Sequence, residues 1–90
     1  MAADESSYQE TIAQLNQFKN RIMEGCRVLQ TAGRDCVDNT DNDPAAVTSN
    51  EKLSECINKI QGTLPQIDSI IWALNEEMEA IKEAAARANS

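Results

Sequence analysis

The chain of 90 residues contains no histidine and only three glycines. Without histidine it lacks the side chain that most often acts as a general base, and no Ser–His or Cys–His pair can form. The glycines, Gly25, Gly33 and Gly62, are too few and too scattered to form a loop that cradles phosphate groups. We therefore expect that this chain is not an enzyme and that it uses no cofactor.

Basic side chains are also scarce. Eight Lys and Arg residues stand against fifteen Asp and Glu residues, which gives a net charge of −7 at pH 7. Such a balance repels phosphate backbones and anionic lipid headgroups. We therefore expect no nucleic-acid partner and no binding to membrane surfaces.

Long apolar runs are missing too. The longest uncharged apolar stretch, residues 70–74, is far too short to span a bilayer, so we expect no membrane insertion. Residues 1–5 end in two acids and contain no basic segment that leads into an apolar one. We therefore expect no cleavable signal peptide and a protein that begins in the cytoplasm.

The three cysteines, Cys26, Cys36 and Cys56, form no C-x-x-C pair. An odd number without metal-ligand spacing predicts neither a disulfide framework nor a zinc site. We interpret them as reduced thiols in a helix interface, since cysteine behaves as a small apolar side chain. A bridge from Cys56 to either of the other two is the alternative.

The first predicted helix begins at Ser7, where residues 7–10 read Ser-Tyr-Gln-Glu and fit a capping box. Apolar residues then recur at helical spacing, in steps of three and four. Lys19 and Gly33 fall on the same stripe, and the lysine can lay its aliphatic stem along it. We expect the helix to run from about residue 7 to about residue 37. The apolar members of its stripe are Tyr8, Ile12, Leu15, Ile22, Cys26, Leu29 and Cys36.

Residues 38–47 have the composition of a turn, because Asp, Asn and Pro bond locally or fix φ. We expect regular helix from about Thr48, whose Thr-Ser-Asn-Glu sequence is a second capping box. Asp43 as a cap before Pro44 is the alternative start. The loop acids do not form a calcium-binding EF-hand, since its sixth position would be Asp43 and its twelfth Ser49. We expect no metal site.

The second predicted helix carries a longer apolar stripe, with steps of four and three that continue without a break. Pro65 removes a backbone donor and clashes with the carbonyl four residues earlier, so we expect a kink near it. Because the stripe keeps its phase, we favour one kinked helix over residues 48–87. A real break, with Thr63 as the cap of a third helix, is the alternative. The stripe consists of Leu53, Ile57, Ile60, Leu64, Ile67, Ile71, Leu74, Met78, Ile81 and Ala85.

These features predict an all-α fold, a single antiparallel two-helix hairpin over residues 1–90. One stripe per helix buries little apolar surface against a conformational cost of roughly 1.5 kcal/mol per residue. Phe18, Cys56 and Ile70 widen the apolar face on one flank. We expect a second copy or another helical protein to cover this flank in a four-helix bundle. The predicted partner-binding residues are Phe18, Ile67, Ile70 and Leu74.

Trp72 points away from the predicted helix interface, on the side of acidic residues. An exposed tryptophan beside carboxylates is typical of a binding hot spot. The alternative is that it folds back over Pro65 or over its own helix. The nearby glutamates Glu76, Glu77, Glu79 and Glu83 are a solvated helix face or a surface for a basic partner.

The hairpin resembles the Esx or WXG-like proteins of type VII secretion and the small helical partners of LXG toxins. The resemblance is carried by the two helices, the polar turn and the spacing from Trp72 to Glu76, which matches the aromatic-x-x-x-acid signal of that family. It implies a protein that leaves the cell folded, docked to a helical partner, with Trp72 and Glu76 read by the export machinery. The turn lacks the family's Trp-x-Gly, which suggests a heteromeric partner instead of a homodimer.

Two other interpretations remain open. A cytosolic coiled-coil adaptor, chaperone or assembly subunit would show the same helices without any export role. The turn sequence Asn42-Asp43-Pro44-Ala45 is similar to that of type III secretion needle subunits. Those subunits polymerise through an apolar C-terminal end, whereas residues 83–90 here are polar and rich in alanine.

Overall fold

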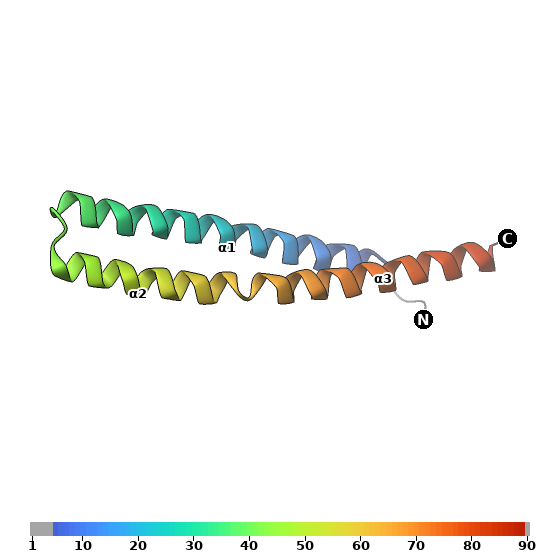
Figure 1. Ribbon diagram of the computed structural model, residues 1–90. Helices are drawn as coiled ribbons and strands as arrows, with labels where there is room; N and C mark the ends of the chain where they lie inside the picture. The colour runs from blue at the N-terminus through green and yellow to red at the C-terminus, as the bar shows by residue number, and fades with distance from the viewer. Residues whose placement is uncertain (1–4, 90) are drawn as a thin grey trace. The chain divides into compact units, whose positions relative to one another are not determined.

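The computed structural model describes residues 5–89, and all their regular structure is helical. The helices are α1 (Glu5–Asn39), α2 (Pro44–Gln61) and α3 (Leu64–Ala88) (Figure 1). The all-α prediction is confirmed. Residues 1–4, on which the signal-peptide expectation partly rests, lie outside the described residues. The chain divides into two compact units, Asn20–Leu64 and Met1–Lys19 with Pro65–Ser90.

The unit of residues 20–64 is a helical hairpin. Its core contains Cys26 of α1 and Ile57 of α2, whose exposed fractions are 3% and 1%. Near the turn, Gly33 lies against Asn50 and Leu53. Gly33, near the end of α1, thus lies beside the beginning of α2, and α2 runs back along α1 from the turn (Figure 1). The two helices are therefore antiparallel.

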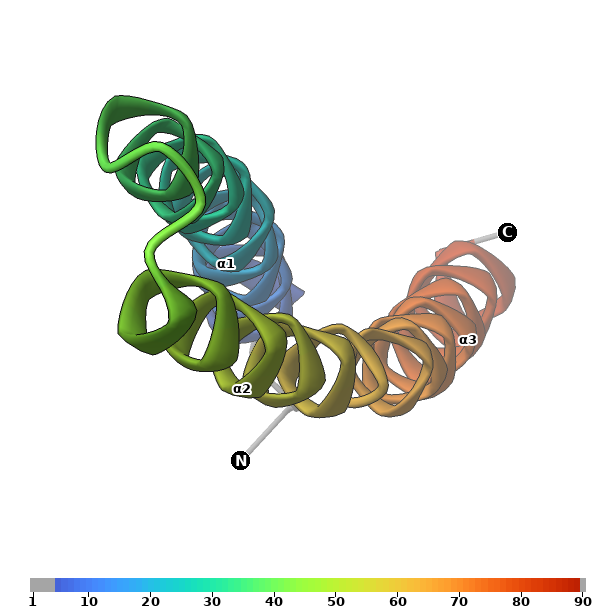
Figure 2. The ribbon, with the colours of Figure 1, turned by 60° about the vertical axis from the view of Figure 1, so that its left-hand side comes forward.

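A short turn joins α1 to α2 (Figures 1 and 2). It is held by backbone hydrogen bonds of its own. The backbone N–H of Asn42 donates to the carbonyl of Val37 at 3.0 Å, a bond that spans five residues and ends α1. Asp41 and Asn42 have positive φ angles of 51° and 60°. Asp and Asn tolerate this left-handed conformation better than other residues with side chains, which explains the composition of the loop.

The start of α2 differs from the favoured prediction. The helix begins at Pro44, four residues before Thr48, and so follows the alternative start. The side chain of Asp43 accepts hydrogen bonds from the backbone N–H groups of Ala45 and Ala46, at 3.1 and 3.3 Å. An aspartate cap followed by proline in the first turn satisfies the free donors of the helix, so the capping box at Thr48 is not needed.

The unit of residues 5–19 and 65–89 is a pair of antiparallel helical segments. The antiparallel direction of the two segments follows from two ion pairs, Lys19–Asp68 at 2.6 Å and Glu5–Lys82 at 3.6 Å, which join the segments in reverse order. Met78 is the buried side chain of this unit, with 9% of its surface exposed. Lys19 lies in the helix interface as predicted, and its amine reaches Asp68 at the edge.

The helical region that follows the turn, residues 44–88, is interrupted at Gly62 and Thr63. The sequence predicts a distortion near this point, caused by Pro65. The carbonyl that Pro65 cannot bond, four residues earlier, is that of Gln61, which is the last residue of α2. The Thr63 hydroxyl donates to the carbonyl of Ile60 at 2.6 Å. The predicted distortion is confirmed, and it takes the form of two helices with a two-residue connection.

Both predicted stripes form the helix interfaces, with a few exceptions. On α1, Leu29 is 43% exposed and Cys36 is exposed, while Val37 is partly buried instead. On α3, Ala85 is exposed, and it lies three residues beyond Lys82, which pairs with Glu5, the first described residue of α1. All three cysteines are free thiols, and only Cys26 lies inside the interface. The remaining stripe residues are partly or fully buried, apart from Ile60 at 36% exposure.

We expect opposite behaviour from two glycines of α1 when each is replaced by alanine. Gly25→Ala should raise the free energy of unfolding by about 1 kcal/mol, because alanine favours helix and no atom lies within 4 Å of the added Cβ. Gly33→Ala should give a smaller gain or a loss, because its Cβ meets the side-chain oxygen of Asn50 and lies 3.1 Å from Leu53 Cδ2. Urea unfolding followed by circular dichroism, in reductant, measures both. Equal gains would show that Gly33 does not set the helix separation.

Candidate protein-docking surfaces

Several large apolar side chains of the described residues remain in contact with water. The apolar side chains that remain most exposed are Phe18, Met23, Val28, Leu29, Ile60, Ile70 and Trp72.

Phe18 and Ile70 form an uncovered apolar patch in the unit of residues 5–19 and 65–89. Their exposed fractions are 55% and 50%. Phe18 directly precedes Lys19 in the stripe of α1, and Ile70 directly precedes Ile71 in the stripe of α3. In an antiparallel helix pair, residues that precede corresponding stripe positions lie on the same flank. The Lys19–Asp68 ion pair sets the two segments at the same level. The structure therefore brings these two predicted partner-binding residues together.

The other two predicted partner-binding residues have a different place. Ile67 and Leu74 are partly buried in the interface between α1 and α3. They are therefore chiefly structural in this unit. Sequence periodicity could have assigned them this role, since both belong to the apolar stripe of α3.

Trp72 lies on the outer face of α3, with 67% of its surface exposed. This exposure rules against the alternative in which the indole folds back onto Pro65 or its own helix. Glu76 and Glu79 follow at spacings of four and seven residues, so they share this face. Glu79 pairs with Lys82 at 3.5 Å, whereas Glu76 has no ion-pair partner among residues 5–89. An indole and a free carboxylate are thus presented together.

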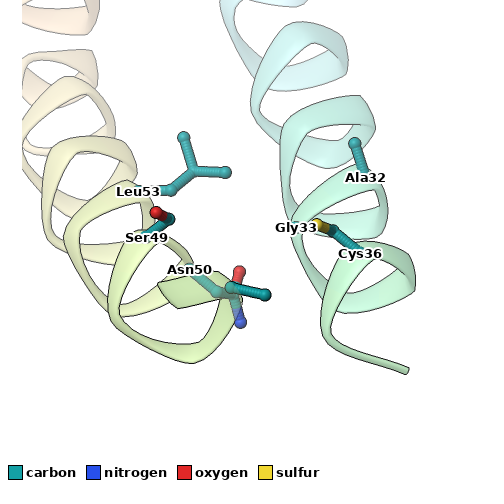
Figure 3. A pocket seen from close by; sticks show the side chains of 7 residues that line it. Ala32, Gly33, Cys36, Ser49, Asn50 and Leu53 are labelled. Atoms are coloured by element: carbon teal, nitrogen blue, oxygen red, sulfur yellow. The ribbon is translucent and has the colours of Figure 1, made fainter. Parts of the chain in front are cut away.

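A hollow in the unit of residues 20–64 was not foreseen from the sequence. It has a volume of about 260 Å³ and opens between α1 and α2 near the turn (Figure 3). It exists because small residues, Gly33 and Ala32 on α1 and Ser49 on α2, stand where larger ones would fill the interface. The signal in the sequence was the run of small residues around Gly33. The lining residues are Ala32, Gly33, Cys36, Ala46, Ser49, Asn50 and Leu53.

The ion pair between Arg27 and Glu24, in the unit of residues 20–64, lies on a different face from the hollow. Arg27 donates two hydrogen bonds to Glu24, at 2.6 and 3.0 Å, and these bonds together with the positive charge lower the pKa of the Glu24 carboxyl. Both side chains are largely exposed, so this pair contributes little to stability. It does neutralise Arg27, which distinguishes that arginine from the other cations of the unit.

Neither a metal site nor a membrane-spanning helix is found in the part of the chain that the structure describes. No three Cys, Asp or Glu side chains of residues 5–89 are grouped so that they would hold a metal ion. None of α1, α2 and α3 is apolar over a length that would cross a bilayer.

Comparison with known proteins adds no relative. No family model matches the sequence, and no curated protein or solved structure is significantly similar to it. The function must therefore be argued from the exposed patch around Phe18 and Ile70, the outer face around Trp72, and the hollow near the turn.

Trp72 is the single tryptophan of the chain, so its fluorescence reports this face alone. We expect an emission maximum close to that of free tryptophan in water, because the indole is 67% exposed. Quenching by neutral acrylamide should be strong, and quenching by iodide weaker, because nearby carboxylates repel the anion. Glu76→Gln should enhance iodide quenching, while Glu10→Gln on α1 serves as the matched control. A blue-shifted emission that resists acrylamide would contradict the exposed position.

Proposed function

We propose that this chain is a non-enzymatic binding protein that docks a helical partner, and that the complex is exported by a type VII-like route. The observation that carries the docking proposal is the pair Phe18 and Ile70, both about half exposed on one flank of a thin helix pair. Such a patch is stabilised when another helix covers it. The export proposal is supported by the exposed Trp72 and Glu76 and by the resemblance of the sequence to WXG-like proteins.

The energy available from the patch is sufficient to matter. Full burial of a Phe or Ile side chain contributes about 1.5–3 kcal/mol, so covering the exposed halves of Phe18 and Ile70 contributes about 2 kcal/mol together. This corresponds to a factor of about thirty in affinity. The partner we favour is a helical segment of a larger exported protein, because a chain with a charge of −7 repels its own copies.

The proposed docking patch and the proposed export signal do not compete for space. Ile70 and Trp72 are two residues apart on α3, which places them roughly 200° apart around the helix axis. A partner that covers Ile70 therefore leaves the indole of Trp72 accessible. This arrangement suits a protein that must be read by the export machinery while its cargo is bound.

The docking proposal is tested by the double substitution Phe18→Ser and Ile70→Ser. We expect recovery of the partner with the tagged chain to fall about tenfold or more, because the lost apolar contact is worth roughly 2 kcal/mol. Met23→Ser is the matched control, since Met23 is 50% exposed on the opposite flank of α1. Recovery is measured by quantitative mass spectrometry of the complex purified from the native host. Light scattering of the purified chain in reductant distinguishes a second copy from a different protein as the partner. Equal recovery with both variants would refute this docking patch.

The export proposal is tested by Trp72→Ala in a bacterium with a type VII system. We expect the variant to remain inside the cell with an unchanged circular dichroism spectrum, because Trp72 makes little contact with the fold. Immunoblots of culture supernatant and cells measure the distribution. Met23→Ala, which removes another exposed apolar side chain, serves as the control. Normal export of the Trp72→Ala protein would refute Trp72 as part of the export signal, whereas an unsubstituted chain that stays inside the cell would leave the cytosolic adaptor as the function.

A further inference from the structure

Two rows of side chains on the unit of residues 20–64 lie on the same flank as the hollow. On α1 the row follows steps of four, three and four, and on α2 it follows steps of three, four and three, so each row occupies one face of its helix. Ala32 and Ser49 each belong to a row and also line the hollow, which places both rows on that flank (Figure 3). The rows consist of Arg21, Gly25, Val28 and Ala32 on α1, and of Ser49, Lys52, Cys56 and Lys59 on α2.

The charge of this flank is opposite to that of the whole chain. Arg21, Lys52 and Lys59 are exposed, and none of them has an ion-pair partner among residues 5–89. The single acid that continues either row is Asp35, one step beyond Ala32 toward the turn. The two rows with Asp35 carry three cations and one carboxylate, and so a net positive charge, although the chain carries −7. The exposed Glu55 lies just outside the α2 row, three residues after Lys52 and four before Lys59.

The middle of the flank is small and apolar. An added Cβ at Gly25 would meet no atom within 4 Å, so the surface there is open. Cys56 is an exposed thiol, and Val28 is 51% exposed. The hollow of about 260 Å³ lies at the turn end of this strip. The flank thus has an apolar floor with a cation on the α1 edge and two cations on the α2 edge.

We infer that this flank binds an amphipathic helix of the partner whose apolar stripe is bordered by Asp and Glu side chains. The apolar stripe would lie on Ala32, Gly25 and Cys56, and one large side chain would enter the hollow. The bordering carboxylates would pair with Arg21 on one edge and with Lys52 and Lys59 on the other. This inference rests on the proposed function and specifies the chemistry of the helical partner. A second copy is disfavoured here, because the same positive flank would face itself.

The probe is a synthetic helical peptide of 18 residues, the length of α2, with leucines on one stripe and glutamates beside it. A matched peptide carries lysine in place of each glutamate. Binding of the fluorescein-labelled peptides to the full-length chain is measured by fluorescence anisotropy at low and high salt. We expect the acidic peptide to bind, its affinity to fall with salt, and the basic peptide to bind about tenfold more weakly or not at all.

Charge reversal locates the site. Lys52→Glu with Lys59→Glu should weaken the acidic peptide about tenfold or more, because two attractive contacts become repulsive. Arg27→Glu with Arg34→Glu changes the net charge equally, but these arginines lie on the other flank of α1, so we expect a change below about twofold. The peptide should also slow alkylation of Cys56, which lies in the middle of the flank. Circular dichroism verifies that each variant is folded.

The outcomes separate this inference from the proposed function. If both peptides bind equally, if the acidic peptide does not bind, or if both double variants lose affinity equally, the inference is wrong. If Phe18→Ser with Ile70→Ser releases the natural partner while Lys52→Glu with Lys59→Glu does not, docking stands and the charged flank is not its site. If the acidic peptide binds at this flank while the Phe18 and Ile70 variant keeps its partner, the flank stands and the Phe18 patch is not needed.

Discussion

The whole structure depends on a single row of contacts between antiparallel helices. Each helix faces its neighbour with one apolar stripe, and among residues 5–89 only Cys26, Ile57 and Met78 are removed almost completely from water. A core of this size offsets little of the conformational entropy lost when helices form. The chain therefore gains much from any additional helix that covers its flanks, and binding and folding are linked through the same apolar side chains.

The periodicity of the sequence predicted most of this fold, because a helix interface is encoded by spacing alone. The stripes from Tyr8 to Cys26 and from Leu53 to Ile81 appear in the structure in the predicted phase. The start of α2 was harder, since Asp43 and Thr48 both offer caps and sequence alone does not rank them. The structure selects Asp43, whose carboxylate bonds two backbone donors. The distortion at Pro65 was predictable in position, whereas its form depended on how Gly62 and Thr63 close the preceding helix.

Some features of the candidate sites were likewise predictable from the sequence, and others were not. Exposure of Phe18, Ile70 and Trp72 followed from their positions beside or opposite the stripe. The partial burial of Ile67 and Leu74 followed from the same rule, which ranks them as interface residues first. The small residues around Gly33 were a signal for the hollow, but its existence and volume depend on how closely the two helices approach there, which the sequence does not specify. The alignment of Arg21 with Lys52 and Lys59 likewise required knowing which positions of α1 and α2 share a flank.

The three thiols differ in their exposure to solvent, so their reaction rates can report how often α1 and α2 separate locally. Cys36 and Cys56 meet solvent directly, whereas Cys26 is 3% exposed between α1 and α2. A reagent can reach Cys26 only when the helix pair separates, so its modification rate measures the free energy of that separation. The two exposed thiols report the intrinsic reactivity of the reagent in the same sample. Local opening of the hairpin can therefore be measured with the chain's own cysteines, without an engineered residue.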